Sequence, residues 1–317
     1  MARKTDILCI GTALVDSIIR GFDPEPVSAS GYRAGSCDLK AGGEAVNQSV
    51  AAARLGMKAK ILCALGEDGA GSMVLGYLDQ AGVDTGLVVR SGEHPTPVTT
   101  MFVREDGTRK SITNNAHRYN FHPERYTSSF ADTRAVILGS LFRAPFDDPG
   151  IIFSVLRDAR DAGAVVLADT KLPNFRILGL DDLKEALPLI DWITPNEDEA
   201  RYFTGKEDPA EMAEAFLGYG IRNVIIKLGG KGCYFRNAQA EISLPALPVP
   251  AVDSTGAGDC FIAGFAAELL RGSAPEDALL FANACGALCT TAVGAGTALR
   301  SRGQVLRFMA ECRQPGQ

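Results

Sequence analysis

Residues 253–259 read Asp-Ser-Thr-Gly-Ala-Gly-Asp, and an apolar-periodic run from Cys260 to Leu270 follows directly. The small residues let the backbone approach a ligand without interference from Cβ atoms, and a helix that begins here leaves its first amides unpaired. Unpaired amides at a helix N-terminus bind anions. The stretch therefore predicts a turn, a helix behind it and an anion site in front.

Asp259 is an acidic side chain at the start of that helix. Its carboxylate would repel a phosphate if anion binding were the only task of the site. The residue is better explained if the carboxylate takes a proton from a hydroxyl group while the amides stabilise charge on the group under attack. We therefore expect phosphoryl transfer to an alcohol. The alternative is that Asp259 only caps the helix, because Asp is common at helix starts.

The composition is that of an ordinary globular protein. The chain has 317 residues, of which 46% are hydrophobic and 22% are charged. The net charge is −6 without a block of like charge, so we expect neither a nucleic acid nor an anionic membrane as partner. No apolar run approaches the roughly 20 residues that cross a bilayer, and residues 1–6 lack the apolar part of a signal peptide. We expect a cytoplasmic protein.

The eight cysteines do not form a metal or disulfide pattern. The nearest pair, Cys285 and Cys289, lies in a helical run with no matching His or second pair, so zinc is not expected. We expect reduced thiols in the core.

The second half of the chain alternates strands and helices, which is typical of a parallel sheet covered on both faces. The expected strands are 136–138, 165–168, 192–194 and 224–228. The expected helices are 151–162, 197–203, 210–217, 259–271, 275–291 and 303–312.

The first half predicts a strand at 7–11 whose carboxyl end carries Asp16 into a site, and a helix from Gly43 that stops at Gly56. Further expected elements are strands 60–65 and 87–90 and a helix at 70–80. Strands 98–103 and 108–112 flank a hairpin turn at 105–107. The region 16–40 is expected to be irregular or to hold short strands. With it, this hairpin is expected to form a small sheet on a single domain that spans 1–317.

Three further stretches suit the same chemistry. Gly42, Gly43 and Asn47 open a helix where backbone and amide groups could contact a polyol, although for this stretch alone a loop and cap is the commoner explanation. Asn196 and Glu199 follow a strand and suit hydrated Mg²⁺ and phosphate oxygens, and the alternative is an acidic first turn.

The third stretch, 227–232, reads Lys-Leu-Gly-Gly-Lys-Gly after an apolar strand. A nucleotide could lie over this turn, whose plainer explanation is a hairpin. It is not a Walker loop, and no part of the chain has the dinucleotide fingerprint. On the expected sugar side, Ser140 ends another strand and is a candidate to contact the acceptor.

The order of these stretches, with Gly-Gly-x-x-x-Asn first and the 253–259 stretch last, resembles the ribokinase-like carbohydrate kinase family, also called the PfkB family. The resemblance runs over nearly the whole chain, from Asp16 to the helix after Asp259. It implies an α/β fold with a central, mostly parallel sheet, helices on both faces and a small β-sheet lid. It also implies an ATP-dependent phosphotransferase that uses Mg²⁺.

The resemblance assigns a role to each matching residue. Asp259 matches the catalytic base. The anion hole for the transferring phosphoryl group matches Gly256, Ala257 and Gly258. The sugar-contacting positions match Asp16, Gly42, Gly43 and Asn47. The Mg²⁺, phosphate and nucleotide positions match Asn196, Glu199, Lys227, Gly229, Gly232 and Asn283, with Glu199 acting on Mg²⁺ through water. A monovalent-cation site for K⁺ matches Asp253, Thr255, Thr290, Val293 and Ala295, although 294–297 departs from the usual loop of the family.

The resemblance also implies that lid segments at about 16–40 and 96–112 exclude water from the site and pair into a homodimer. Two other functions stay open. A nucleoside kinase of the same fold would need aromatic stacking surface, for which Tyr32, Phe102, Tyr119 and Phe142 are candidates. A non-catalytic sugar-binding regulator is the other. An acidic sugar would call for a cation such as Arg143 or Lys171, which could equally be solvated surface charges.

Overall fold

The computed structural model describes residues 3–21, 33–104, 109–114 and 121–313. The expected hairpin turn at 105–107 lies outside these residues, as do Tyr32 and Tyr119. Within the described ranges, no helix combines the length and apolarity needed to cross a membrane.

An eight-stranded sheet forms the centre of the molecule, in the order β14-β13-β12-β11-β10-β9-β1-β4. The strands from β12 to β4 in this order pair in parallel, and β13 and β14 are antiparallel. The expected mostly parallel sheet is therefore confirmed. The strands are β1 (Thr5–Ile10), β4 (Ala59–Leu62), β9 (Thr133–Leu141), β10 (Val165–Thr170), β11 (Trp192–Ile193), β12 (Asn223–Lys227), β13 (Cys233–Asn237) and β14 (Glu241–Leu244).

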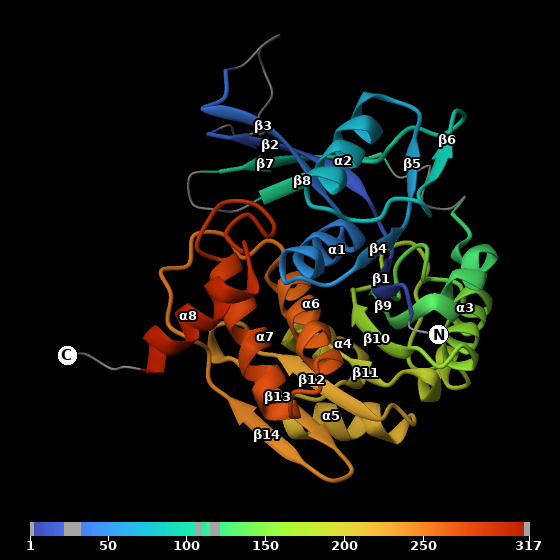
Figure 1. The fold of residues 1–317 in the computed structure, drawn as a ribbon, viewed down its shortest axis with the longest axis vertical. Helices are drawn as coiled ribbons and strands as arrows, with labels where there is room; N and C mark the ends of the chain where they lie inside the picture. The colour runs from blue at the N-terminus through green and yellow to red at the C-terminus, as the bar shows by residue number, and fades with distance from the viewer. Residues whose placement is uncertain (1–2, 22–32, 105–108, 115–120, 314–317) are drawn as a thin grey trace.

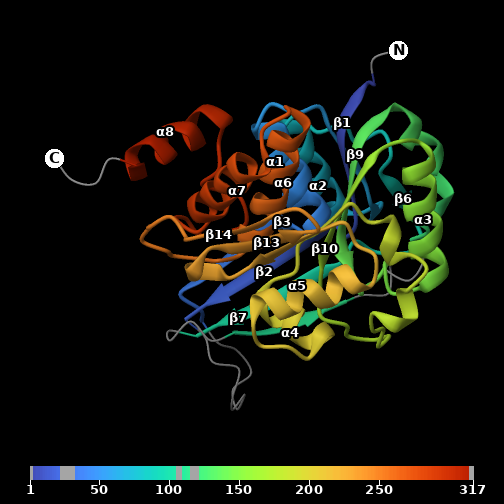
Figure 2. The same cartoon turned by 90° about the horizontal axis from the view of Figure 1, so that it is seen from below.

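The sheet is buried on both faces because alternate residues of each strand enter different cores. In β1, Ile7 and Cys9 belong to one core, and Leu8 and Ile10 belong to the other. Figure 2 shows α6 and α7 on one side of the sheet and α4 and α5 on the other. The helices of the first core are α1 (Glu44–Arg54), α2 (Gly69–Gln80), α6 (Ala257–Leu270), α7 (Pro275–Cys289) and α8 (Arg302–Arg313). Those of the second core are α3 (Pro149–Asp161), α4 (Glu197–Thr204) and α5 (Pro209–Gly218).

A separate four-stranded sheet, which we call the lid, stands at the top of Figure 1 in the order β3-β2-β7-β8. The region 16–40, expected to be irregular or to hold short strands, supplies two strands that pair antiparallel from Leu14 opposite Gly42 to Arg20 opposite Ser36. Asp16 therefore lies on a lid strand and not at the end of β1. The lid strands are β2 (Leu14–Arg20), β3 (Ser36–Gly42), β7 (Val98–Val103) and β8 (Arg109–Thr113).

Two differences from the expected elements have local causes. The strand expected at 60–65 is divided, because the chain leaves the main sheet after β4 and forms β5 (Ala64–Gly66), which pairs with β6 (Val89–Ser91). The hairpin of β13 and β14 was not expected. The 227–232 stretch, with its short 3₁₀ helix Gly229–Lys231, is the turn between β12 and β13, which pair antiparallel, so the hairpin interpretation of this stretch is confirmed. Further 3₁₀ helices are Pro123–Asp132, Asp181–Leu183 and Leu187–Leu189.

All eight cysteines are free thiols, as expected. Cys37 on the lid is exposed, however, so it is not part of the core.

Candidate active site

The turn before α6 depends on its glycines. Gly256 is the N-cap residue and has a left-handed backbone, with φ of 77°. A Cβ atom on it would lie 2.6 Å from the Cβ of Ala295, so the turn packs tightly against the loop that follows α7. No side chain caps the helix at this position. The amide of Ala257 donates to the carbonyl oxygen of Ser254 at 3.2 Å, so the amides of Gly256 and Gly258 are the ones left for a ligand. A Cβ on Gly258 would lie 3.0 Å from Nζ of Lys227, which places that ammonium group beside the same turn.

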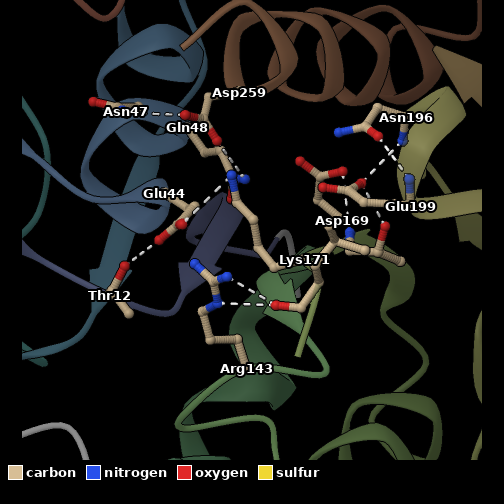
Figure 3. A network of polar contacts seen from close by, with 12 residues as sticks. Thr12, Glu44, Asn47, Gln48, Arg143, Asp169, Lys171, Asn196, Glu199 and Asp259 are labelled. Carbon is tan, nitrogen blue, oxygen red and sulfur yellow. Dashed lines mark hydrogen bonds and ion pairs between the residues drawn. The ribbon is translucent and has the colours of Figure 1, made fainter. Parts of the chain in front are cut away.

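Asp259 directs its carboxylate across the site to α1 (Figure 3). Oδ2 accepts a hydrogen bond of 2.9 Å from Nδ2 of Asn47, and Oδ1 accepts one of 3.0 Å from Nε2 of Gln48. These bonds run to another helix, so capping of α6 does not explain the residue. The side chain is buried, with 8% of the residue exposed.

The surroundings of Asp259 suit a base that works near neutral pH. Burial raises the pKa of its carboxyl to about 7, and the negative charges of Glu44 and Asp169 act in the same direction. The ammonium group of Lys171 and the hydrogen bond from Asn47 oppose this rise. A carboxylate with this pKa accepts a proton more readily than an exposed one.

Lys171 lies between two groups of carboxylates in the middle of the site (Figure 3). Its Nζ is 3.7 Å from Oε1 of Glu44, whose other oxygen accepts a hydrogen bond from Thr12. The charges of Glu44, Asp259, Asp169 and Glu199 raise the pKa of Lys171, so the group stays positive. The other expected cation, Arg143, donates to the carbonyl oxygen of Leu172 at 2.8 Å and 3.2 Å. Neither side chain is therefore simply a solvated surface charge.

Asp169 forms a buried ion pair at the carboxyl ends of β10 and β12. Its Oδ1 accepts hydrogen bonds from Nζ of Lys227 at 2.6 Å and from Oγ1 of Thr194 at 3.0 Å. A Cβ on Gly258 would lie 3.9 Å from its Oδ2. The pair thus joins the sheet to the N-terminal turn of α6.

Asn196 and Glu199 form a capping box at the start of α4. The side chain of Asn196 accepts from the amide of Glu199 at 2.9 Å, and Glu199 accepts from the amide of Asn196 at 2.9 Å. Oγ1 of Thr170 donates to the same Glu199 oxygen at 2.8 Å. Burial raises the pKa of Glu199, while the charge of Lys227 lowers it. Asn196 and Glu199 therefore do cap the first turn of α4, as the alternative explanation expected. The capping uses Oε2 of Glu199 and leaves Oε1 for a ligand.

The site offers carboxylates for a water-mediated Mg²⁺ ion. No group of three or more candidate ligands gathers among the described residues. Mg²⁺ is commonly held by one or two carboxylates together with waters and substrate phosphates, and Asp169 and Glu199 lie close enough to affect each other electrostatically. Oδ2 of Asp169 and Oε1 of Glu199 accept no hydrogen bond within the described part of the chain. The residues therefore fit such an ion, with Asp169 as a member that the sequence analysis did not name.

The glycines predicted to contact sugar have structural roles in this conformation. A Cβ on Gly42 would overlap Oδ2 of Asp16, which puts that carboxylate directly against the start of α1. Gly43 has φ of 98°, and a Cβ there would overlap the carbonyl oxygen of Thr12. Ser140 is completely buried, and its Oγ has no hydrogen-bond partner among the described residues. An unpartnered buried hydroxyl is expected to gain a partner when a polar ligand binds.

Two of the residues predicted on the nucleotide side, Gly232 and Asn283, contact the segment that follows β14. Gly232 has φ of 105°, and a Cβ on it would overlap the carbonyl oxygen of Leu244. Nδ2 of Asn283 donates to the carbonyl oxygen of Pro245 at 3.3 Å. Gly229 has no neighbour within 4 Å of its Cβ position, so the turn is open there.

The five residues predicted to bind a monovalent cation do come together, but oxygens of Asp253, Thr290 and Val293 already have protein donors. The carbonyl of Thr290 accepts from the amides of Val252 at 2.7 Å and Asp253 at 3.1 Å. Val293 accepts from Nζ of Lys40 at 2.9 Å. Asp253 accepts from the amide and hydroxyl of Thr255 at 3.0 and 2.7 Å. The set does not fit an open cation site in this conformation.

The sequence did not predict several of these contacts. Gln48 is adjacent to Asn47, yet the two amides hold one carboxylate together, and only the pairing of α1 with α6 shows this. Asp169 was detectable in principle, because it ends a parallel strand at the edge where α/β proteins bind ligands. Glu44 and Thr12 gave no signal without the fold.

Comparison with known proteins agrees with this geometry. The sequence model described as pfkB family carbohydrate kinase matches residues 4–302. Ribokinase of Haemophilus influenzae is 28% identical over 276 residues, covering 84% of this chain and 87% of the relative. The 2-dehydro-3-deoxygluconokinase of Bacillus subtilis is 29% identical over 282 residues, covering 84% and 86%.

A solved structure extends the similarity to the fold. Ribokinase of Arabidopsis thaliana, complexed with ribose and ATP, superposes with a TM-score of 0.85 at 26% identity, covering 98% of this chain and 99% of that chain. The fold implied by the sequence resemblance is thereby confirmed.

Proposed function

Because the chain belongs to the pfkB family of carbohydrate kinases, we propose that it transfers the γ-phosphoryl group of ATP to a hydroxyl group of a ribose- or ketohexose-like sugar, with Asp259 as the general base. The observation that carries this proposal is the Asp259 carboxylate, buried at the start of α6 and held by Asn47 and Gln48. The relatives that act on ribose and on a sugar acid support a small carbohydrate as the acceptor class.

In the proposed reaction, Asp259 accepts the proton of the sugar hydroxyl as its oxygen forms a bond to the γ-phosphorus. The bond from phosphorus to the ADP oxygen breaks, and the electron pair leaves with ADP. The amides at Gly256, Ala257 and Gly258 donate to the transferring oxygens, and the nearby Lys227 adds positive charge. Mg²⁺, held through water by Glu199 and Asp169, would offset charge on the phosphates.

Binding of the two substrates is assigned to opposite sides of Asp259. We place the sugar against Asp16, Gly42, Gly43, Asn47 and Ser140, where the buried Ser140 hydroxyl still has an unfilled hydrogen bond among the described residues. We place the nucleotide over the open turn at Gly229 and along Lys227, Gly232, Asn196 and Asn283. The Arabidopsis neighbour, whose structure holds ribose and ATP, supports a sugar site and a nucleotide site on this fold.

We infer that the lid covers the sugar and that two lids pair into a homodimer. Asp16 and Lys40 lie opposite each other on β2 and β3, and Lys40 contacts the loop after α7. This face of the lid is therefore turned toward the main domain. The reduced thiols and the use of ATP are consistent with a cytoplasmic enzyme.

A nucleoside kinase is the second candidate, and one observation counts against it. Phe142, a candidate for base stacking, is completely buried and stacks on Phe203 with ring centroids 4.0 Å apart. Its ring is not available to a ligand. The name of the Bacillus relative favours an acidic sugar as the acceptor. Lys171, which was expected to bind the acid group, is however already paired with Glu44.

The direct test replaces Asp259 with Asn, which keeps the shape but cannot accept the proton. We expect kcat to fall at least about 100-fold, while the dissociation constants for sugar and MgATP measured by calorimetry change little. Asp79→Asn, an exposed change on α2, is the matched control and should keep full activity. If Asp259→Asn retained more than about a tenth of the activity, the base assignment would be wrong.

The acceptor is identified by a coupled ADP-release assay with ribose, fructose, 2-dehydro-3-deoxygluconate and inosine. Turnover with a sugar at least about tenfold above inosine in kcat/KM supports the proposed function. A preference for inosine would establish the nucleoside kinase. No ADP release with any acceptor would favour a non-catalytic regulator.

A further inference from the structure

Lys40 connects the lid to the main domain through a charged contact. It lies on β3, and its Nζ donates to the carbonyl oxygen of Val293 at 2.9 Å, 253 positions away in the sequence. Gly294 has φ of 96°, and a Cβ on it would lie only 2.6 Å from the same Nζ. The loop after α7 therefore passes close to the ammonium group, in a backbone conformation that favours glycine.

The contacted loop is part of the anion site. The amide of Gly294 donates to Oδ2 of Asp253 at 2.8 Å. The next residue, Ala295, packs against Gly256, the N-cap of α6. Three successive residues of one loop thus join the Lys40 ammonium group, the Asp253 carboxylate and the turn that presents the α6 amides.

The carboxylate of Asp253 needs a positive neighbour. Although its burial acts in the opposite direction, hydrogen bonds from Thr255 and Gly294 and the charge of Arg20 keep its pKa low. The residue is therefore negative at neutral pH, next to amides that must attract phosphate. Arg20 and Lys40 both come from the lid, on β2 and β3. A third cation, Arg54 of α1, donates further along the same loop, to the carbonyl oxygen of Gly296 at 2.6 Å.

We propose that the ammonium group of Lys40 takes the position of the monovalent cation in the loop formed by Asp253, Thr255, Thr290, Val293 and Ala295. An ammonium group and K⁺ carry the same charge, and both are bound by carbonyl oxygens. The sequence resemblance led us to expect a free ion there, but the Val293 oxygen is already bonded to Lys40 and the Thr290 oxygen to two amides. The protein then supplies this charge itself, and phosphoryl transfer needs no added K⁺. Only the part of this inference that concerns turnover rests on the proposed function.

The test compares the wild type, Lys40→Met and Lys184→Met. Methionine keeps the length of the side chain and removes its charge. Lys184 is exposed near the end of a 3₁₀ helix, so its replacement controls for the change of net charge. Thermal unfolding and thallium binding are measured without substrates. Unfolding and turnover are compared in KCl and in choline chloride of equal ionic strength, so that electrostatic screening is constant. Choline is too large to enter the loop.

We expect the wild type and Lys184→Met to unfold at the same temperature in both salts, and crystals soaked in thallium(I) to show no anomalous peak at Val293. Lys40→Met should be stabilised by K⁺ over choline and should bind thallium beside the Val293 oxygen. In the kinase assay, its kcat should rise about fivefold or more when KCl replaces choline chloride, while that of the wild type stays constant.

Two results would overturn the inference: thallium bound at Val293 in the wild type, or a Lys40→Met protein that shows neither thallium binding nor stabilisation by K⁺. The binding and unfolding measurements do not involve turnover. A failure of the proposed sugar kinase function therefore leaves them interpretable, and it shows only in the acceptor assay.

Discussion

At the scale of single residues, the site depends on how charges are balanced around Asp259. Its carboxylate is buried and held by two amide donors, so its two oxygens have fixed directions. Burial raises its pKa to about 7 while Lys171 opposes the rise. Loss of either influence should therefore appear as a shift in the pH dependence of the reaction.

We predict that kcat/KM for the sugar falls as the pH drops below about 7, since the protonated carboxyl cannot accept a proton. The free enzyme governs kcat/KM, so the unliganded pKa is the relevant one. Lys171→Met removes the opposing charge and should move this acid limb to higher pH. A pH series from about 5.5 to 9 for both proteins measures the shift. Arg143→Met, which removes a charge bonded to the neighbouring Leu172 carbonyl, is the control. A wild-type rate that stays constant down to pH 5.5 would contradict the assignment of Asp259 as base.

At the scale of elements, each motif performs a structural task as well as its proposed chemical one. Gly43 allows β3 to turn directly into α1 above the carbonyl of Thr12, and Gly256 allows α6 to begin against Ala295. Asn196 and Glu199 close the first turn of α4. The structural and the chemical role of a motif can be separated by comparing a substitution that keeps its capping hydrogen bonds with one that removes them.

Asn196→Ala removes the cap and should lower the free energy of unfolding by about 1 kcal/mol. Glu199→Gln keeps an oxygen that can accept from the Asn196 amide and from Thr170, so its stability should change less. If Glu199 acts on Mg²⁺ through water, Glu199→Gln should raise the Mg²⁺ concentration for half-maximal rate by about tenfold or more. Chemical denaturation and Mg²⁺ titration measure the two effects. An unchanged Mg²⁺ requirement would leave Glu199 with the structural task alone.

The sequence predicts helices and strands well where hydrophobic periodicity is strong. It predicts them poorly where a turn determines with which strand a segment pairs. The α/β alternation after Ala135 and the helix behind Gly256 have the expected types, with ends that differ by a few residues. Strand β13 was not predicted, because the glycine turn at 229–232 that joins it to β12 is compatible with both a ligand loop and a hairpin. The division of the 60–65 strand depends on β6, a partner more than 20 positions away.

At the scale of the whole molecule, the site is assembled from segments that the sequence keeps far apart. Asn47 and Asp259 meet across α1 and α6, Asp169 and Lys227 meet across the sheet, and Lys40 reaches Val293 from the lid. Most of these residues are predictable from the sequence, because each belongs to a short motif. The hydrogen bond that each one makes is not, since those partners are fixed only by the packing of helices on the sheet and of the lid above it.

The lid also indicates how two molecules would associate. Cross-strand register places Leu39, Ser17, Thr100 and Ile112 in one row across β3, β2, β7 and β8. The adjacent row holds Asp16 and Lys40, and neighbouring rows face opposite sides of a sheet. The row with Leu39 and Ile112 is therefore turned away from the main domain, where these side chains are 62% and 70% exposed.

Two large apolar side chains on the outer face of a small sheet are expected to be covered by another protein surface. In the proposed homodimer, that surface is the lid of a second copy. Ile112→Glu should then convert a dimer into a monomer, because a buried, unpaired carboxylate would stand in the interface. Sedimentation equilibrium of the wild type and the variant measures this, with Ile177→Glu, equally exposed at 70% but outside the lid, as the control. A wild type that is monomeric at every concentration, or an Ile112→Glu protein that dimerises as well as the control, would show that the lids do not form the interface.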